Sequence, residues 1–451
     1  MYKFSTAKQS MSTLATSGAL ATLAVEITTM QNNNDSKKYM RTIYPWFVWF
    51  LGACFFFYKY LVQVSPSVMT SDLMHAFNIN GVGLGNLSAC YFYAYLMMQI
   101  PVGILLDKFS PRYLTALAIL ICGISTLIFS ETSSLILACL SRAFIGFGAA
   151  FAAVSCFKNA ALWFPPKRFA FISGMCMTAA MLGAVGGQAP LSLLVQNFGW
   201  RTALQIISGL GILLSLIYVL AIRDKEKKQV VIQPKKKAQP ILILKSKQAW
   251  LLSFYSGLAF APVSVFGGLW GVPFLQQAYS LSAPKAALAV SWIFIGFAIG
   301  APLLGWLSDA IGKRKPLMTF GTLLSSVCLM MVIYGTNINM GVISLYLFLF
   351  GFGASGFFIS FSMIKESFPI LLTATVLGFM NTFDSICEAL TEPLVGMLLD
   401  FGWDGCLVNG IHQFSTYGYK MALVLLPIYL IIALILLIFI KETHCQNFEK
   451  V

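Results

Sequence analysis

Apolar segments of about 20 residues recur along the whole chain, and this recurrence restricts the possible folds more than any other feature. A helical segment of that length spans the hydrocarbon core of a lipid bilayer. Of the 451 residues, 58% are hydrophobic and only 10% are charged, whereas soluble domains carry about 25% charged residues. The alternation with a period of two that is typical of membrane β-barrels is absent. The sequence therefore predicts an all-α membrane protein.

Twelve transmembrane helices are expected, near residues 43–64, 83–106, 113–130, 133–157, 169–195, 201–222, 249–272, 284–307, 316–335, 341–364, 370–399 and 419–440. If the N-terminus is cytoplasmic, the external loops contain only Arg201, Lys285 and Lys420. This distribution follows the positive-inside rule and predicts both termini in the cytoplasm, with the chain in the cell inner membrane. The net charge of +14 is thus explained by the membrane topology. We expect the protein to lie in the lipid bilayer and not to bind nucleic acid.

A polar stretch rich in Lys and Pro divides the twelve spans into six and six. Residues 11–30 are mildly apolar, but their many Ser and Thr residues do not fit a signal peptide. We therefore predict five segments: a flexible cytoplasmic tail (1–42), a first six-helix bundle (43–222), a basic cytoplasmic linker (223–247), a second six-helix bundle (248–441) and a cytoplasmic tail (442–451).

The two bundles contain an internal repeat. "GILLDKFSPR" (103–112) matches "GWLSDAIGKR" (305–314), and "GFGA" occurs at both 146–149 and 351–354. Similar matches at nearly constant spacing indicate two pseudo-symmetric halves, which is the layout of two-bundle secondary transporters. We interpret the repeated glycines of "GFGA" as sites of close helix packing.

The repeated stretch resembles the signature G-x-x-x-D-[RK]-x-G-[RK]-[RK] of the major facilitator superfamily. The first copy keeps Gly103, Asp107, Lys108 and Arg112, although Ser110 and Pro111 replace the usual Gly and basic residue. The second copy keeps Gly305, Asp309 and Arg314 but lacks the basic residue after Asp. The resemblance implies that these residues form a gating motif that locks the outward-facing state. We expect the glycines to permit close helix approach.

Three acids interrupt the eleventh predicted span: Asp384, Glu388 and Glu392. A carboxylate at the bilayer centre costs about 2.5–3.5 kcal/mol even on insertion scales, so such residues normally face an interior cavity. At 100° per residue they share an arc of about 80° with Asn381. The predicted topology brings Lys59 of the first span and Arg142 of the fourth to a similar depth. A purely structural ion pair between the bundles is the alternative to a substrate or proton site.

The charges suggest a substrate class. Acids outnumber bases, so we expect one carboxylate to bind and release a proton near neutral pH. Glu388 is the preferred candidate for this role, followed by Asp384 and Glu392. A zwitterion would place its carboxylate on Arg142 or Lys59 and its ammonium on an acid. This predicts proton-coupled uptake of an amino acid or small peptide and disfavours polyanions. "YFYAYLMMQIPVGILLD" and "GGLWGVPFL" resemble proteobacterial nutrient carriers, including the intraphagosomal amino-acid transporter group. The alternative is a proton/organic-cation, drug or siderophore efflux antiporter.

Four further residues are candidate substrate contacts, with simple helix packing as the alternative for each: Tyr58, Gln188, Tyr255 and Trp292. Other polar residues of the first two spans are interpreted as packing residues, namely Tyr60, Gln63, Tyr91 and Tyr95. The three His residues lie outside the spans, so no metal site is predicted. No phosphate-binding loop is present, which argues against an ATP-driven pump. We expect a monomeric transporter, not an enzyme, with no cofactor and a proton gradient as its driving force.

Overall fold

The computed structural model describes residues 34–165, 168–223, 241–369, 372–408 and 410–446. The chain divides into two compact units, Met1–Phe50 and Leu51–Val451. In the first unit, the described part is the beginning of helix α2 (Asn34–Val64), where Trp46 and Trp49 make an edge-to-face contact. Residues 1–33 of the predicted tail lie outside the described residues, and α2 begins before the predicted start of the first span.

The second unit contains two helical halves. The first half, within 51–223, contains the end of α2 followed by η2 (Ser65–Val68), α3 (Thr70–Phe77), α4 (Gly81–Lys108), α5 (Pro111–Glu131), α6 (Leu135–Ala149), α7 (Phe151–Trp163), α8 (Phe169–Gly186) and α9 (Ala189–Ala221). Helix α9 is interrupted at Gly199, whose φ of 78° is accessible to glycine at little steric cost. The turn at Gly199 separates the fifth and sixth predicted spans, as expected from the sequence.

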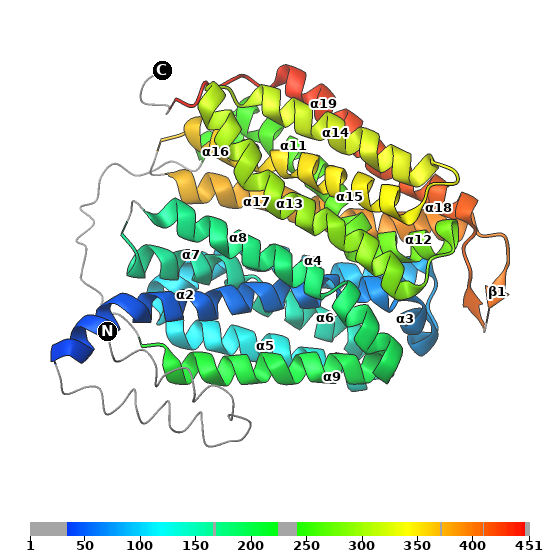
Figure 1. Cartoon of the computed structure of the whole chain (residues 1–451), viewed down its shortest axis with the longest axis horizontal. Coiled ribbons are helices and arrows are strands. Elements are labelled where there is room, and N and C mark those ends of the chain that lie inside the picture. Colours follow the sequence, from blue (N-terminus) through cyan, green and yellow to red (C-terminus); the bar gives the residue numbers. More distant parts are fainter. Residues whose placement is uncertain (1–33, 166–167, 224–240, 370–371, 409, 447–451) are drawn as a thin grey trace, which may run out of the picture. The chain divides into compact units, whose positions relative to one another are not determined.

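The second half, within 241–446, contains α10 (Ile241–Lys245), α11 (Lys247–Val265), the π-helix η4 (Phe266–Trp270), α12 (Gly271–Tyr279), α13 (Ala283–Ile311), α14 (Lys315–Tyr334), α15 (Met340–Ala354), η5 (Ser355–Phe357), α16 (Phe358–Glu366), α17 (Thr373–Phe401), α18 (Thr416–Leu423) and α19 (Leu425–Phe439). Between α17 and α18, β1 (Leu407–Val408) pairs antiparallel with β2 (Ile411–His412). The sequence did not predict this hairpin. Figure 1 shows α4–α9 on one side and α11–α19 on the other.

Each of the twelve predicted spans overlaps a helix of the structure. Among the described residues, nine helical segments are long and apolar enough to cross a membrane, and one of them, Ile172–Ala221, contains most of α8 and all of α9. Helices α4 and α17 are long but are not among these nine apolar segments. Helix α17 contains the three acids Asp384, Glu388 and Glu392. The fifth predicted span covers α8 and the first residues of α9, because α8 ends at Gly186 and α9 begins at Ala189.

Local sequence signals account for many helix ends. The side chains of Asn80, Ser246, Asn339 and Ser415 accept hydrogen bonds from backbone N–H groups in the first turns of α4, α11, α15 and α18. These N-cap bonds satisfy donors that have no partner within the helix. Proline at the first or second position begins α5, α9, α13 and α14, where its missing N–H has no consequence.

Close helix contacts are made at the repeated glycines, which confirms the packing role predicted for "GFGA". A Cβ at Gly146 would overlap the carbonyl oxygen of Tyr91, and a Cβ at Gly351 would overlap that of Ile293. Glycine therefore lets α6 approach α4, and α15 approach α13, at backbone contact distance.

This packing predicts the effect of adding one methyl group. Gly351→Ala should lower the thermal unfolding midpoint in detergent, because its Cβ meets backbone that cannot move aside, an overpacking penalty of about 1–3 kcal/mol. Gly209→Ala in α9 is the matched control, since a Cβ there meets no atom within 4 Å. An equal effect of both variants would show that the α13–α15 contact is not tight.

Candidate functional site

The two bases of the predicted site bind the same turn of α2. Lys59 is buried, and its Nζ donates to Oε1 of Gln63 at 2.5 Å while lying 3.7 Å from the centre of the Tyr60 ring. Arg142 of α6 donates from its two terminal nitrogens to the carbonyl oxygens of Val62 at 3.1 Å and Gln63 at 3.4 Å. The structure thus fixes both cations against one short stretch of backbone.

Helix packing places the guanidinium. Because Gly146 allows α6 to touch the backbone of α4 at Tyr91, Arg142 lies with its Cζ 5.3 Å from the centre of the Tyr91 ring. The Tyr91 hydroxyl donates to Gln63 Oε1 at 3.3 Å. The Nε of Arg142 is buried and makes no hydrogen bond to another described residue. One donor of this Arg is therefore left for another partner.

The acids of α17 are as deeply buried as the bases but less well satisfied. Asp384, Glu388 and Glu392 are 4%, 5% and 1% exposed. Asp384 accepts a hydrogen bond of 2.6 Å from Ser256 of α11. Glu388 Oε1 and Glu392 Oε2 have no hydrogen-bond partner among the described residues. A buried carboxylate oxygen without a donor is destabilising unless it takes up a proton or meets a ligand.

Acids and bases face one another across the two halves. Glu388 interacts electrostatically with Lys59, and Glu392 with Arg142. Among the described residues, however, no carboxylate oxygen comes within 4 Å of either cation; ion pairs form elsewhere, for example Arg314 with Asp309, Arg314 with Glu366, and His412 with Asp400. The bases and acids thus lie near each other without direct pairing.

A small cavity opens beside this cluster. Its walls come from both halves and are formed by Tyr60, Gln63, Val64, Met181, Phe260, Val263, Ser264 and Phe294. A Tyr hydroxyl, a Gln amide and a Ser hydroxyl offer hydrogen bonds there, and the remaining wall is apolar. The cavity volume of about 10 Å³ is close to that needed for one water molecule, so this space is too small for an organic solute in the present conformation.

Several predicted substrate contacts lie elsewhere. Gln188 links the halves, since its Nε2 donates to Gly267 O at 2.7 Å and to Ser67 Oγ at 3.0 Å. Tyr255 shares a hydrogen bond of 2.9 Å with Thr322 of α14. Trp292 is 38% exposed and contacts Phe348. In this conformation all three residues contact neighbouring helices or segments, and their role in substrate binding stays a prediction.

Two further predicted substrate contacts, Tyr58 and Asn381, lie in different surroundings. Tyr58 points toward α9, because a Cβ at Gly211 would overlap its ring and hydroxyl. It therefore packs within the first half, away from the acids. Asn381 is partly exposed, and it lies one turn before Asp384 on α17. Its backbone oxygen accepts a bond from Ser385.

The first copy of the gating motif lies at the end of α4 and the start of α5. Arg112 donates to the carbonyl oxygen of Val219 at the end of α9, inside the same half. The side chain of Asp107 lies outside the described part of the chain, and Lys108 is the last residue of α4. The expected close approach at the motif glycines is wrong for this conformation, since a Cβ at Gly103 or Gly305 meets no atom within 4 Å.

The second copy forms a charged cluster that includes the C-terminal segment. Arg314 binds Asp309 at 2.5 Å and Glu366 of α16 at 2.6 Å. Beyond α19, Glu442 accepts hydrogen bonds of 2.9 Å from the backbone nitrogens of Arg314 and Lys315, which begin α14. Thr443 donates to Glu366 at 2.5 Å. The last described residues are thereby held against the α13–α14 loop.

Ser256 was not among the site residues predicted from the sequence. Ser256 reaches Asp384 because Gly257, next to it, brings α11 against the backbone of Phe383 in α17. A serine beside a glycine in an apolar span was the available signal, since small residues mark close helix contacts. Gln63 and Tyr91 were predicted as packing residues, and their contacts lie within the first half, where Gln63 accepts hydrogen bonds from Lys59, Arg142 and Tyr91.

Comparisons with known proteins agree with this architecture. The profile of the family described as Major Facilitator Superfamily matches residues 48–272 and 252–446. The probable galactarate/D-glucarate transporter GudP of Bacillus subtilis is 25% identical over 424 residues, covering 84% of this chain and 92% of that protein. The probable hexose phosphate transport protein of Chlamydia trachomatis is 25% identical over 397 residues, covering 80% and 85%.

A solved structure shares the fold. It is that of a bacterial homolog to the human lysosomal transporter Spinster in an inward-facing and occupied conformation, with a TM-score of 0.74 and 17% identity over 88% of this chain and 97% of that one. The family match covers almost all described helices of both halves. This chain therefore belongs to the major facilitator superfamily and is an all-α, multi-pass membrane protein of the transporter type.

Proposed function

We propose that the chain is a proton-coupled secondary transporter that takes up a small organic acid across the cell inner membrane, with both termini in the cytoplasm. The observation that carries the proposal is the buried cluster in which Lys59 and Arg142 face Glu388 and Glu392 without direct pairing. The solute carboxylate would bind at the two cations. The unpaired acids would take up protons in the same step.

Charge balance explains why binding and protonation are coupled. The cluster holds two cations and three carboxylates, so an anion meets net negative charge as long as the acids are ionised. Protonation of Glu388 and Glu392 leaves the two cations facing Asp384 alone, which favours an anion. Each protonated acid also becomes a hydrogen-bond donor toward the solute. Proton uptake and anion binding therefore stabilise each other.

Two solute classes satisfy this arrangement. A hydroxylated organic acid is the first candidate, because relatives of similar length are named as transporters of galactarate and D-glucarate. An amino acid or small peptide is the second, because bases lie on the first half and acids on the second, so that a zwitterion would bridge them. Both classes share the carboxylate and differ in the group at the other end.

The alternating-access cycle would use the two halves as rocking bodies around this cluster. The predicted domains, 43–222 and 248–441, would be these bodies, and the linker 223–247 would connect them. A cation-efflux antiporter fits less well, because Lys59 and Arg142 would repel a cationic substrate from the cluster that they form with the acids.

Transport assays with matched solutes test the substrate class. Purified protein in liposomes should accumulate radiolabelled D-glucarate when the outside is acidic, with at least tenfold less uptake at equal pH. Alanine and lactate differ only in ammonium against hydroxyl, and their ability to compete separates the two classes. Preference for alanine would replace the first candidate by the second. Equal accumulation with and without the pH gradient would exclude proton coupling.

Replacing Glu388 by Gln tests the proton carrier. Gln keeps the shape of the protonated acid but cannot release a proton, so gradient-driven uptake should fall at least tenfold while solute exchange across the membrane continues. Asp72→Asn, an exposed acid in α3, is the control and should transport normally. Unchanged pH-dependent uptake by the Glu388→Gln variant would remove this residue from the proton path.

Replacing Arg142 by Lys tests the carboxylate contact. A planar guanidinium donates two bonds to one carboxylate, whereas an ammonium acts as a point charge. We expect the KM for the carboxylate solute to rise about tenfold or more, with the thermal midpoint measured in parallel because Arg142 also binds the backbone of α2. If the KM is unchanged in a stable variant, Arg142 has only a structural role.

A further inference from the structure

A second contact between the halves lies far from the central cluster. Asp400, near the end of α17, accepts hydrogen bonds from the backbone nitrogens of Gly81 at 2.9 Å and Val82 at 2.7 Å. These are the first two residues of α4, in the other half of the chain. Each carboxylate oxygen takes one N–H group.

The start of a helix is a favourable place for this carboxylate. The first N–H groups of α4 have no partner within the helix, and the helix dipole makes this end positive. Asn80 already satisfies the third of them, Gly83 N, with its own side chain. Asp400 supplies the two acceptors that the local sequence does not, so the beginning of α4 is completed from the other half.

Close backbone packing accompanies the contact. A Cβ at Gly396 would overlap the carbonyl oxygen of Gly81, and a Cβ at Gly85 would lie 2.6 Å from the carbonyl oxygen of Glu392. Helices α4 and α17 thus touch continuously from Asp400 to Glu392, about 12 Å along the helix axis. Opening this seam would expose the central acids, and it requires the Asp400 bonds to break.

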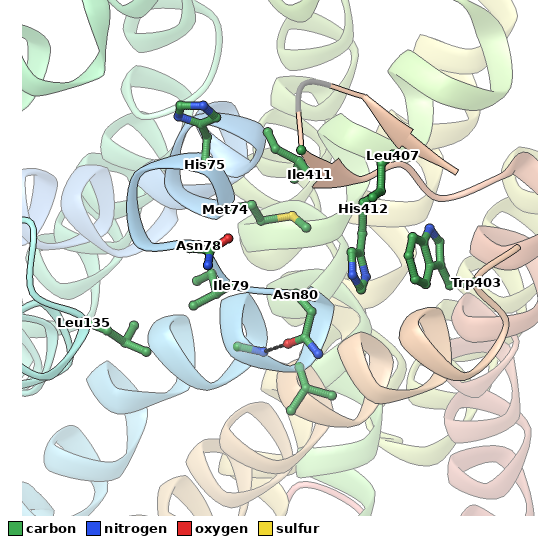
Figure 2. Close-up of a pocket in the computed structure, with 13 residues that line it drawn as sticks. Met74, His75, Asn78, Ile79, Asn80, Leu135, Trp403, Leu407, Ile411 and His412 are labelled. Atoms are coloured by element: carbon green, nitrogen blue, oxygen red, sulfur yellow. Dashed lines mark hydrogen bonds between the residues drawn. The ribbon is translucent and has the colours of Figure 1, made fainter. Parts of the chain in front are cut away.

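The Asp400 contact can be reached from solvent. Beside it lies a groove of about 1070 Å³ between α3, the start of α4 and the β1–β2 hairpin, shown in Figure 2. His412 lines the groove, with Nδ1 3.4 Å from Asp400 Oδ1 and its ring stacked at 3.7 Å on Trp403. The predicted topology places this end of the molecule outside the cell.

We propose that Asp400 is the latch of the external gate. Its carboxylate, on the second half, holds the first turn of α4, on the first half, and its release is required for the outward-facing state. Asp400 is a positioning residue that touches no solute. The inference rests on the alternating-access cycle proposed above, but not on the class of solute or on proton coupling.

Cysteine labelling measures the gate without any solute. Ser88 lies on α4, one turn beyond Gly85, and is 2% exposed, so a cysteine there reacts only when the seam opens. In the full-length protein with Cys406 replaced by Ser, we would measure the rate at which a membrane-impermeant maleimide labels Ser88→Cys from outside. The same protein without Ser88→Cys gives the background from the remaining cysteines.

Asp400→Asn and Asp400→Ala should raise this labelling rate by about tenfold or more, the change expected when a charge-assisted hydrogen bond is lost. Asp404→Asn, an exposed acid four residues further on, should leave it unchanged. The isosteric Asn variant preserves the fold, and its thermal midpoint separates gate opening from unfolding. Equal labelling in Asp400→Asn and the parent overturns the latch. If the parent protein takes up no solute while Asp400→Asn still raises the labelling rate, the proposed transport function is contradicted and the latch stands.

Discussion

Burial of charge between the two halves governs the rest of this structure. Five charged side chains, two basic and three acidic, are at most 5% exposed. The bases are anchored on α2 by the Gln63 side chain and by backbone carbonyls. The acids retain oxygens without partners. The cations are thus a fixed part of the site, and the carboxylates are the part whose charge can change.

Polar contacts between the halves gather toward the end of the helices where Asp400 lies. Asp400 binds the first turn of α4, and Gln188 binds the π-helical segment through Gly267. A π-helix leaves a carbonyl group free of its usual partner, which suits such an external bond. The described conformation is therefore closed at this end, and the central acids are shielded by backbone packing as well as by side chains.

The sequence predicted what depends on composition and spacing: the helices, the repeat, the acids on one face of α17 and the two opposing bases. It did not predict what depends on how helices rotate and meet. The contacts of Gln188 and Gln63 could not be predicted, because a polar residue in an apolar span gives the same sequence pattern whether it faces a solute or a neighbouring helix. The role of Asp400 could not be predicted, because its partners are the backbone N–H groups of Gly81 and Val82, more than 300 residues away in the sequence.

The C-terminal segment has a consequence for how the protein is made. Glu442 and Thr443 complete the cluster around Arg314 and Glu366, yet they follow the last transmembrane helix and leave the ribosome after every other element described. Before these residues are synthesised, the backbone N–H groups of Arg314 and Lys315 lack the acceptor oxygens that Glu442 provides. Assembly of the second half is thus completed only after Glu442 and Thr443 have been synthesised.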